Sequence, residues 1–324
     1  MSDILTMIVD GLWLQGDRNI AVKLVSAEKK PLPLWQPGAH IDVHLPGGLI
    51  RQYSLTGSCE DTNHYLLCVS REVASRGGSQ YIHDELRPGQ RLMISSPRNL
   101  FKLQENSHVL LLAAGIGITP LYAMALSLAK SATPFTLHYY VKRTESAAFI
   151  SELSQQLSAD EFHVHNSNDG SSPRIRLSRD IGLPRPGGQI YYCGPKGFMA
   201  QVHESALEVG WDTSQLHSEA FQLNTPACIS ENDDTFTITL SSTGECWPVP
   251  VDRTIAQVLQ QHGVAVPLSC EMGICGACLT PVVEGIVDHR DTVQSEADKN
   301  AKQQHIAICC SRSHSANLVI DMGR

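Results

Sequence analysis

A group of cysteines near the end of the chain has the spacing of a metal site. Cys270, Cys275 and Cys278 form a C-x4-C-x2-C pattern, and two more cysteines follow at positions 309 and 310. This is the spacing of plant-type ferredoxins, whose thiolates hold a [2Fe-2S] cluster. A zinc site or a chance group of buried thiols is the alternative, but zinc sites more often use two C-x2-4-C pairs. The spacing therefore predicts a [2Fe-2S] cluster and leaves Cys309 and Cys310 open as fourth ligand.

Small residues separate these cysteines. Gly273, Gly276 and Ala277 lie between the first three thiols. They suit a loop that bends sharply and turns its amides toward sulfur atoms. If Cys309 and Cys310 lie on a strand, their side chains point to opposite faces, so that only one of them is needed as a ligand.

Two further turns each follow an apolar strand. Residues 113–120 read Ala-Ala-Gly-Ile-Gly-Ile-Thr-Pro and open a helix, so their amides can meet a phosphate at its positive end. Residues 191–195 read Tyr-Tyr-Cys-Gly-Pro and end a strand expected to reach the same edge of a parallel sheet, where ligands bind. Alone, the first turn fits an ordinary strand-to-helix connection, and Cys193 fits a small buried side chain.

A third group of polar residues lies on an early strand. Arg51, Tyr53 and Ser54 alternate so that the arginine and tyrosine share one face and the serine lies on the other. An arginine can bind a phosphate, a tyrosine ring can lie against a flat ligand, and a hydroxyl can reach a ring heteroatom. Residues 76–79, Arg-Gly-Gly-Ser, add backbone donors before a short helix.

The elements that carry these residues change in type along the chain. Residues 1–104 read as short strands of an antiparallel β-barrel, with strands at 41–45, 49–55 and 65–69 and a helix at 79–86. Residues 105–225 alternate strands at 109–114, 135–140 and 189–193 with helices at 120–130, 146–157 and 197–209, which predicts a doubly wound α/β domain. A linker is predicted at 226–234, before an α+β domain at 235–324.

Composition excludes several kinds of partner. The chain has 324 residues, of which 42% are hydrophobic and 18% charged, and its formal net charge is -8. An acidic chain is a poor match for nucleic acid or an anionic membrane, since both require concentrated lysine and arginine. The first residues lack a signal-peptide pattern and no apolar stretch approaches 18 residues, so we expect a cytoplasmic protein that binds neither nucleic acid nor membrane.

The four motifs in this order resemble the phthalate dioxygenase reductase family of the ferredoxin-NADP reductase superfamily. The resemblance implies a β-grasp ferredoxin domain and Cys309 as the fourth cluster ligand. It also implies FMN bound by Arg51, Tyr53, Ser54, Gly77, Gly78 and Ser79, with Phe221 near the flavin, and NADH bound by Gly115, Gly117, Thr119, Cys193, Gly194 and Pro195. Three positions depart from the family pattern: Ala114 replaces a common glycine, and Lys142 with Arg143 can tolerate the 2′-phosphate of NADPH.

The resemblance implies a reductase that feeds a separate oxygenase. A nicotinamide delivers two electrons as hydride and a cluster accepts one, so a flavin must convert between them. The chain shows no recognisable Rieske ligands of its own, and we expect a terminal oxygenase component of Rieske type as acceptor. The alternatives are a redox sensor that turns over slowly and a self-contained flavin reductase whose cluster domain is vestigial.

Overall fold

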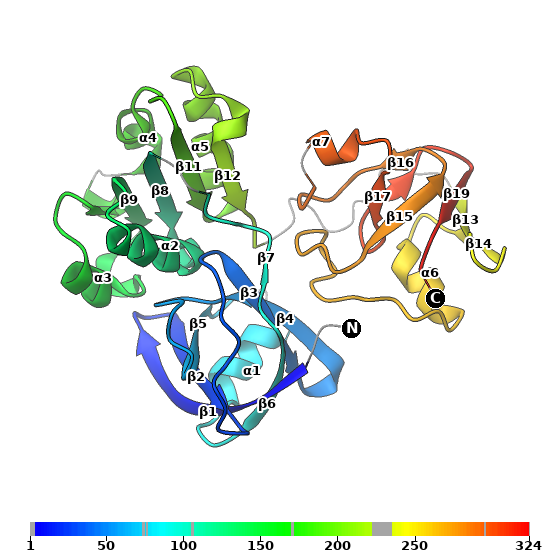
Figure 1. Ribbon diagram of the computed structural model, residues 1–324, viewed down its shortest axis with the longest axis horizontal. Helices are drawn as coiled ribbons and strands as arrows, with labels where there is room; N and C mark the ends of the chain where they lie inside the picture. Colours follow the sequence, from blue (N-terminus) through cyan, green and yellow to red (C-terminus); the bar gives the residue numbers. More distant parts are fainter. Residues whose placement is uncertain are drawn as a thin grey trace. The chain divides into compact units, whose positions relative to one another are not determined.

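The structure is a computed structural model that describes residues 4–72, 75, 77–104, 107–169, 172–221, 235–294 and 296–323. The chain divides into two compact units, Met1–Phe221 and Gln222–Arg324. The first unit contains a β-barrel and a parallel sheet, and the second contains a mixed sheet (Figure 1). The predicted linker at 226–234 lies outside the described residues, and the predicted domain limits remain predictions.

The β-barrel is a seven-stranded antiparallel sheet. Its order is β4-β3-β6-β1-β2-β5, with β7 paired to β3, and a bridge between Thr56 and Leu66 joins the two ends. Alternate residues such as Ile41, Val43 and Ile94 fill the interior with no exposed area. The elements are β1 (Ile4–Gln15), β2 (Asn19–Ser26), β3 (Ala39–Leu45), β4 (Leu49–Ser54), β5 (His64–Ser70), α1 (Gly78–Asp84), β6 (Arg91–Ser95) and β7 (Arg98–Asn99), with a 3-10 turn at Pro46–Gly48.

The second sheet of this unit is parallel, in the order β10-β9-β8-β11-β12. Odd-numbered residues of β8 pack with α2 and α3, and even-numbered ones with α4 and α5, so helices cover both faces (Figure 1). This is the predicted doubly wound fold. Its strands are β8 (His108–Ala114), β9 (Phe135–Val141), β10 (Phe162–Asn166), β11 (Gly188–Cys193) and β12 (Leu216–Glu219); its helices are α2 (Ile118–Lys130), α3 (Ile150–Gln156), α4 (Pro173–Ile181) and α5 (Lys196–Glu208).

One predicted helix of this sheet begins later than expected. The sequence predicted a helix over 146–157, but a 3-10 turn at Thr144–Ser146 precedes α3, which begins at Ile150. Phe149 interrupts the helix with a φ of 61°, while its amide donates to Oε1 of Gln15 on the barrel. A long-range contact thus overrides local helix propensity there.

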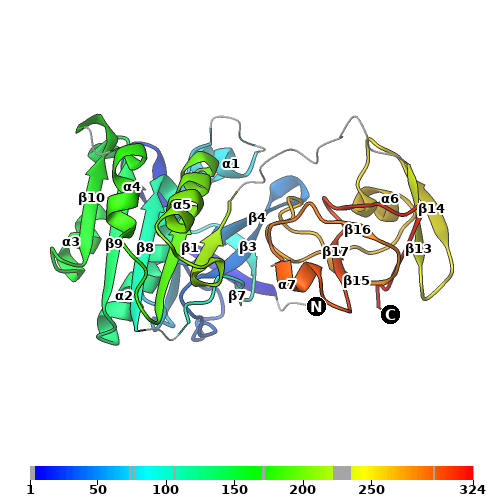
Figure 2. The ribbon, with the colours of Figure 1, turned by 90° about the horizontal axis from the view of Figure 1, so that it is seen from above.

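The second unit is an α+β fold. Its sheet runs β14-β13-β19-β15-β17, with β13 and β19 parallel and the other pairs antiparallel (Figure 1). Figure 2 shows α6 beside β14. Helix α6 begins at a capping box on Thr254 and buries Ile255, Val258 and Leu259 in the core. The elements are β13 (Phe236–Leu240), β14 (Cys246–Val249), α6 (Ile255–Gln261), β15 (Leu279–Glu284), β16 (Val287–Asp288), α7 (Glu296–Lys299), β17 (His305–Ala307), β18 (Arg312–Ser313) and β19 (Asn317–Ile320).

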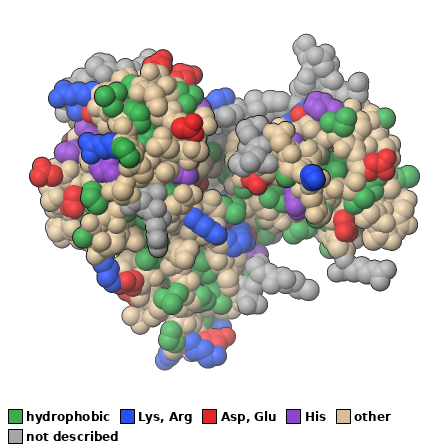
Figure 3. Space-filling view, turned by 45° about the horizontal axis from the view of Figure 1, so that its top comes forward, with side chains coloured by type: hydrophobic (Ala, Val, Ile, Leu, Met, Phe, Trp, Pro, Cys, Tyr) green, Lys and Arg blue, Asp and Glu red, His purple; other side chains and the backbone are tan. Residues whose placement is uncertain are grey.

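The surface carries charges of both signs. On the face drawn in Figure 3, lysine and arginine side chains lie scattered among acidic ones and do not gather in one basic patch. Within the part of the chain that the structure describes, no helix is both long and apolar enough to span a membrane.

Candidate functional site

The predicted cluster ligands form two close pairs of thiols. Cys270 lies within hydrogen-bond reach of Cys275, and Cys278 within reach of Cys309. Each of the four is at most 4% exposed. Among the described residues no three of these sulfurs lie within 4.8 Å of one another, as one tetrahedral ion would require. Two thiolates for each of two irons fit a [2Fe-2S] cluster better than a single zinc ion.

The loop between the cysteines turns three amides toward sulfur. The backbone N–H groups of Met272, Gly273 and Ala277 donate to Cys270, Cys309 and Cys275 at 3.3, 3.3 and 3.4 Å. Gly273 has a φ of +67°, and a Cβ there would lie 2.4 Å from Sγ of Cys310. The loop therefore requires glycine at position 273 both for its backbone conformation and for space.

The structure distinguishes Cys309 from Cys310 in a way that strand alternation did not predict. Both residues lie in a turn after β17, so the expectation that they alternate on a strand is wrong. Sγ of Cys309 accepts from Gly273 and contacts Cys278. Sγ of Cys310 instead lies 3.7 Å from the carbonyl of Ala307. Cys309 is thus the cysteine placed with the other three.

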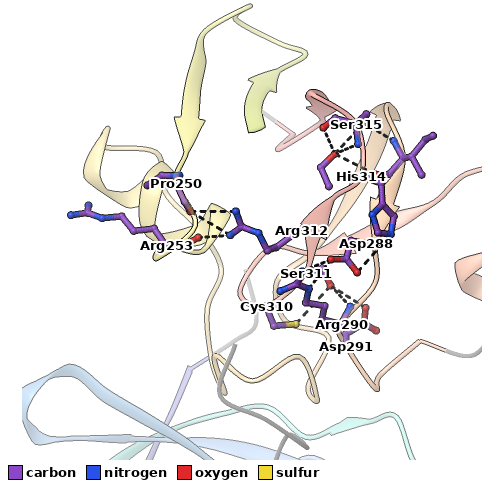
Figure 4. A network of polar contacts seen from close by, with 12 residues as sticks. Pro250, Arg253, Asp288, Arg290, Asp291, Cys310, Ser311, Arg312, His314 and Ser315 are labelled. Carbon is purple, nitrogen blue, oxygen red and sulfur yellow. Dashed lines mark hydrogen bonds and ion pairs between the residues drawn. The ribbon is translucent and has the colours of Figure 1, made fainter. Parts of the chain in front are cut away.

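A polar network around Ser311 stabilises the cysteine loop (Figure 4). Oγ of Ser311 accepts from the amide of Arg290 at 3.1 Å and donates to Oδ1 of Asp291 at 3.4 Å. Asp291 is 3% exposed, and the next residue, Thr292, donates its amide to the carbonyl of Gly273 at 3.1 Å. The segment 288–292 therefore holds the loop residue whose amide contacts Cys309.

Arg312 connects the turn that carries Cys309 to the segment before the N-terminus of α6 (Figure 4). Its guanidinium donates to the carbonyls of Arg253 at 3.0 Å and of Pro250 at 3.3 and 3.4 Å, and it lies 5.1 Å from the centre of the Phe236 ring. The residue is only 7% exposed. A buried arginine thus fixes the distance between the cluster turn and the helix.

Part of the predicted flavin site, Arg51 and the turn at 77–79, comes together on the barrel. The Arg51 side chain lies across Gly78, where a Cβ would be 2.5 Å from it, and Gly77 adopts a φ of +89°. Oγ of Ser79 donates to Oγ of Ser75, which also accepts from the amide of Gly77. These close approaches explain the two glycines. A cavity of about 330 Å³ lies beside this turn, lined by Arg18, Arg71, Glu72, Ser75 and Gln80.

The two predicted nicotinamide turns pack directly against each other. A Cβ on Gly117 would lie 2.2 Å from the carbonyl oxygen of Cys193, and one on Gly194 would lie 2.9 Å from Cβ of Ala114. The departure at Ala114 is therefore accommodated by a glycine opposite. Gly115 has a φ of +55°, Oγ1 of Thr119 donates to the carbonyl of Ile116 at 3.0 Å, and Pro195 is the N-cap of α5.

Three residues meet where the barrel faces the sheet edge. His40 and Ser54 are cross-strand partners on β3 and β4. Oγ of Ser54 donates to Oε2 of Glu219 at 3.3 Å, and Nδ1 of His40 lies 4.0 Å from Oε1. Glu219 ends β12, where it pairs with Cys193. The two predicted binding regions thus share one carboxyl group.

Both ionisable groups of this trio favour their neutral forms. Burial raises the pKa of Glu219 from 4.5 to about 8, although the hydrogen bond from Ser54 opposes this. Burial, with the Arg98 charge, lowers the pKa of His40 to about 4. The two are therefore not an ion pair at neutral pH. Nε2 of His40 is buried without a hydrogen-bond partner among the described residues, as expected where a polar ligand completes a site.

No role was assigned to His40 or Glu219 from the sequence. One signal near this site was Phe221, two residues after Glu219, which was expected near the flavin. Phe221 is the last described residue of the first unit, where it packs partly buried on the core around β8. Of the two cations after β9, Arg143 forms an ion pair with Asp17, and Lys142 is exposed.

Comparisons with known proteins agree with this architecture. Residues 238–314 match the family of 2Fe-2S iron-sulfur cluster binding domains, and this span includes all four paired cysteines. The chain is 42% identical to a vanillate O-demethylase oxidoreductase of Pseudomonas sp. over 320 residues, which cover 98% of this chain and 100% of that protein.

Two solved structures are similar along nearly the whole chain. The crystal structure of an intact type IV self-sufficient cytochrome P450 monooxygenase matches with a TM-score of 0.86 and 33% identity over 98% of this chain. This chain spans only 41% of that protein. Phthalate dioxygenase reductase, described as a modular structure for electron transfer from pyridine nucleotides to [2Fe-2S], matches with a TM-score of 0.73 and 31% identity over 98% of both chains.

The fold and the cysteine site define an oxidoreductase with a [2Fe-2S] ferredoxin domain. Within that class, the chain belongs to the phthalate dioxygenase reductase family, together with the vanillate O-demethylase oxidoreductases.

Proposed function

We propose that this chain is the reductase component of an oxygenase or demethylase system. It takes hydride from NADH onto FMN and passes single electrons through the [2Fe-2S] cluster to a terminal oxygenase. The observation that carries this proposal is 42% identity along the full length of a vanillate O-demethylase oxidoreductase, with all four paired cysteines inside the matched cluster domain.

In this proposal Arg51 and the turn at 77–79 hold the flavin phosphate. The Tyr53 ring lies against the flavin ring, the Ser54 hydroxyl reaches a ring heteroatom, and Phe221 lies nearby. The packed turns at 115–119 and 193–195 hold the dinucleotide. The flavin supplies the change from a two-electron donor to a one-electron acceptor. Cys270 and Cys275 hold one iron, and Cys278 and Cys309 the other.

In this proposal Glu219, Ser54 and His40 accept and donate protons beside the flavin ring. NADH oxidation leaves one proton for every two electrons that go to the acceptor. Glu219 carries a proton at neutral pH and contacts Ser54, so this pair can exchange a proton with a bound ligand without exposing the site to water. The neutral His40 ring is a second group that can exchange a proton, and its Nδ1 lies 4.0 Å from Oε1 of Glu219.

An anaerobic NADH titration tests the electron path. The purified protein should show flavin bleaching, a paramagnetic signal of a reduced [2Fe-2S] cluster, and FMN after the flavin is released. Cys275→Ser serves as the matched variant, because it should keep flavin reduction by NADH and lose cytochrome c reduction. Unchanged cytochrome c reduction in this variant would favour the self-contained flavin reductase, and slow turnover of the intact protein would favour the sensor.

We propose a Rieske-type oxygenase in the cytoplasm as the partner. The similarity to a P450 monooxygenase makes a haem oxygenase the alternative. Coupled turnover with any Rieske-type oxygenase encoded alongside this chain tests the partner. Product formation with a Rieske protein supports the proposal, whereas rapid ferricyanide reduction with no transfer to that protein contradicts it.

A further inference from the structure

A group of side chains of the types that bind metals also lies in the parallel sheet of the first unit. His138 on β9, His165 on β10 and Asp180 on α4 each present one ligand atom, and these atoms all lie within 4.8 Å of one another. Within the described residues this is the one such group of three. The histidines are 9% and 6% exposed, and the Asp180 side chain is 4% exposed.

The distances within this group are close to those of a tetrahedral ion. Nδ1 of His138 lies 2.8 Å from Nε2 of His165, which lies 3.7 Å from Oδ2 of Asp180. Ligand atoms about 2.1 Å from a zinc ion are about 3.4 Å apart when tetrahedral. The two imidazoles therefore need to separate by only about half an ångström, and their shared proton can move to a nitrogen that faces away.

We infer that His138, His165 and Asp180 form a site for a divalent transition metal, Zn²⁺ by the chemistry of its ligands. Two imidazole nitrogens and one carboxylate oxygen are a common zinc donor set, with water in the fourth position. The three ligands come from two neighbouring strands and from the helix that covers them. A bound ion would tie α4 to the outer edge of the sheet.

Arg176 competes with the metal for this site. Its guanidinium donates to both carboxylate oxygens of Asp180 at 3.2 Å, and the Tyr140 hydroxyl donates to Oδ2 at 2.7 Å. The Arg176 side chain is 30% exposed, so it can move into solvent and release the Asp180 carboxylate to bind the ion. Because a cation beside the carboxylate repels a second one, removal of Arg176 should strengthen zinc binding.

Equilibrium dialysis of the holoprotein against ZnCl₂, with bound zinc counted by mass spectrometry, tests this inference. The background carries Cys246→Ser, because that exposed thiol would bind zinc itself. The parent should bind one zinc per chain. His138→Gln and His165→Gln should each weaken binding at least tenfold, whereas Arg176→Met should tighten it. His163→Gln is the matched control, since this ring stacks on His138 at 5.0 Å but lies outside the group.

Amide hydrogen exchange gives a second readout that does not depend on the histidine variants folding. Zinc should slow exchange in α4 of the parent, and more so in Arg176→Met at the same zinc concentration. The inference is overturned if the parent binds no zinc at micromolar concentrations. It is equally overturned if His138→Gln and His165→Gln bind zinc as the parent does, because the group would then be only a hydrogen-bonded part of the core.

Discussion

The hydroxyl of Ser54 donates a hydrogen bond to Oε2 of Glu219 across 3.3 Å, although the two residues are 165 positions apart. Ser54 belongs to the barrel and Glu219 to the last strand of the parallel sheet. The bond therefore joins the predicted flavin surface to the predicted nicotinamide edge, at a carboxyl group that stays protonated at neutral pH.

Glu219→Gln should change the pH dependence of stability. Because burial raises the folded-state pKa of Glu219 from 4.5 to about 8, its favourable contribution is complete below pH 4.5 and is lost as pH rises toward 8. The loss is at most about 5 kcal/mol, from 1.36 kcal/mol per pH unit. Thermal unfolding followed by flavin fluorescence from pH 5 to 9 should give a flatter profile for the variant. Parallel profiles for the two proteins would mean that Glu219 ionises normally.

Cys309→Ser should lose the [2Fe-2S] cluster, and Cys310→Ser should keep it. Only Cys309 lies with Cys278 and receives the Gly273 amide, while Cys310 faces Ala307. Iron per chain and the paramagnetic signal of the reduced protein measure the difference. Retention of the cluster by Cys309→Ser together with its loss from Cys310→Ser would show that the turn has the other register.

Arg312→Met should destabilise the second unit by about 2–4 kcal/mol, through loss of charged hydrogen bonds and of the contact with Phe236. Urea-induced loss of the visible cluster absorbance measures this change. Arg253→Met is the control, since that side chain is exposed and should alter stability by less than about 0.5 kcal/mol. Equal effects from the two variants would contradict the role of Arg312.

Asp17→Asn should improve the use of NADPH. Arg143 follows β9, at the end of the strand where the adenosine ribose is expected, but it is engaged by Asp17. Release of this exposed pair, which contributes about 0–1 kcal/mol, should raise kcat/KM for NADPH by at most about fivefold and leave that for NADH unchanged. Steady-state cytochrome c reduction with each nucleotide checks both values, and an equal rise for both would point to a change elsewhere.

The sequence by itself predicted several of the elements and the cluster loop, because both depend on local patterns. Apolar runs such as 109–114 predicted buried parallel strands, and the C-x4-C-x2-C spacing predicted three cluster ligands. The sequence also indicated that the glycines at 77, 78, 117 and 273 lie in binding turns. In the structure, close backbone approach or a positive φ requires glycine at these positions.

Only the tertiary structure decided which distant residues meet. Phe149 leaves the helical conformation for a contact with Gln15. The turn that contains both Cys309 and Cys310, which alternation did not predict, gives the Gly273 amide to Cys309. The pKa of Glu219 is raised by burial at a position beside Ser54. His138 on β9 contacts His165 on the neighbouring strand β10. Contacts between residues far apart in the chain, and the desolvation that follows from them, leave no local pattern from which they could be predicted.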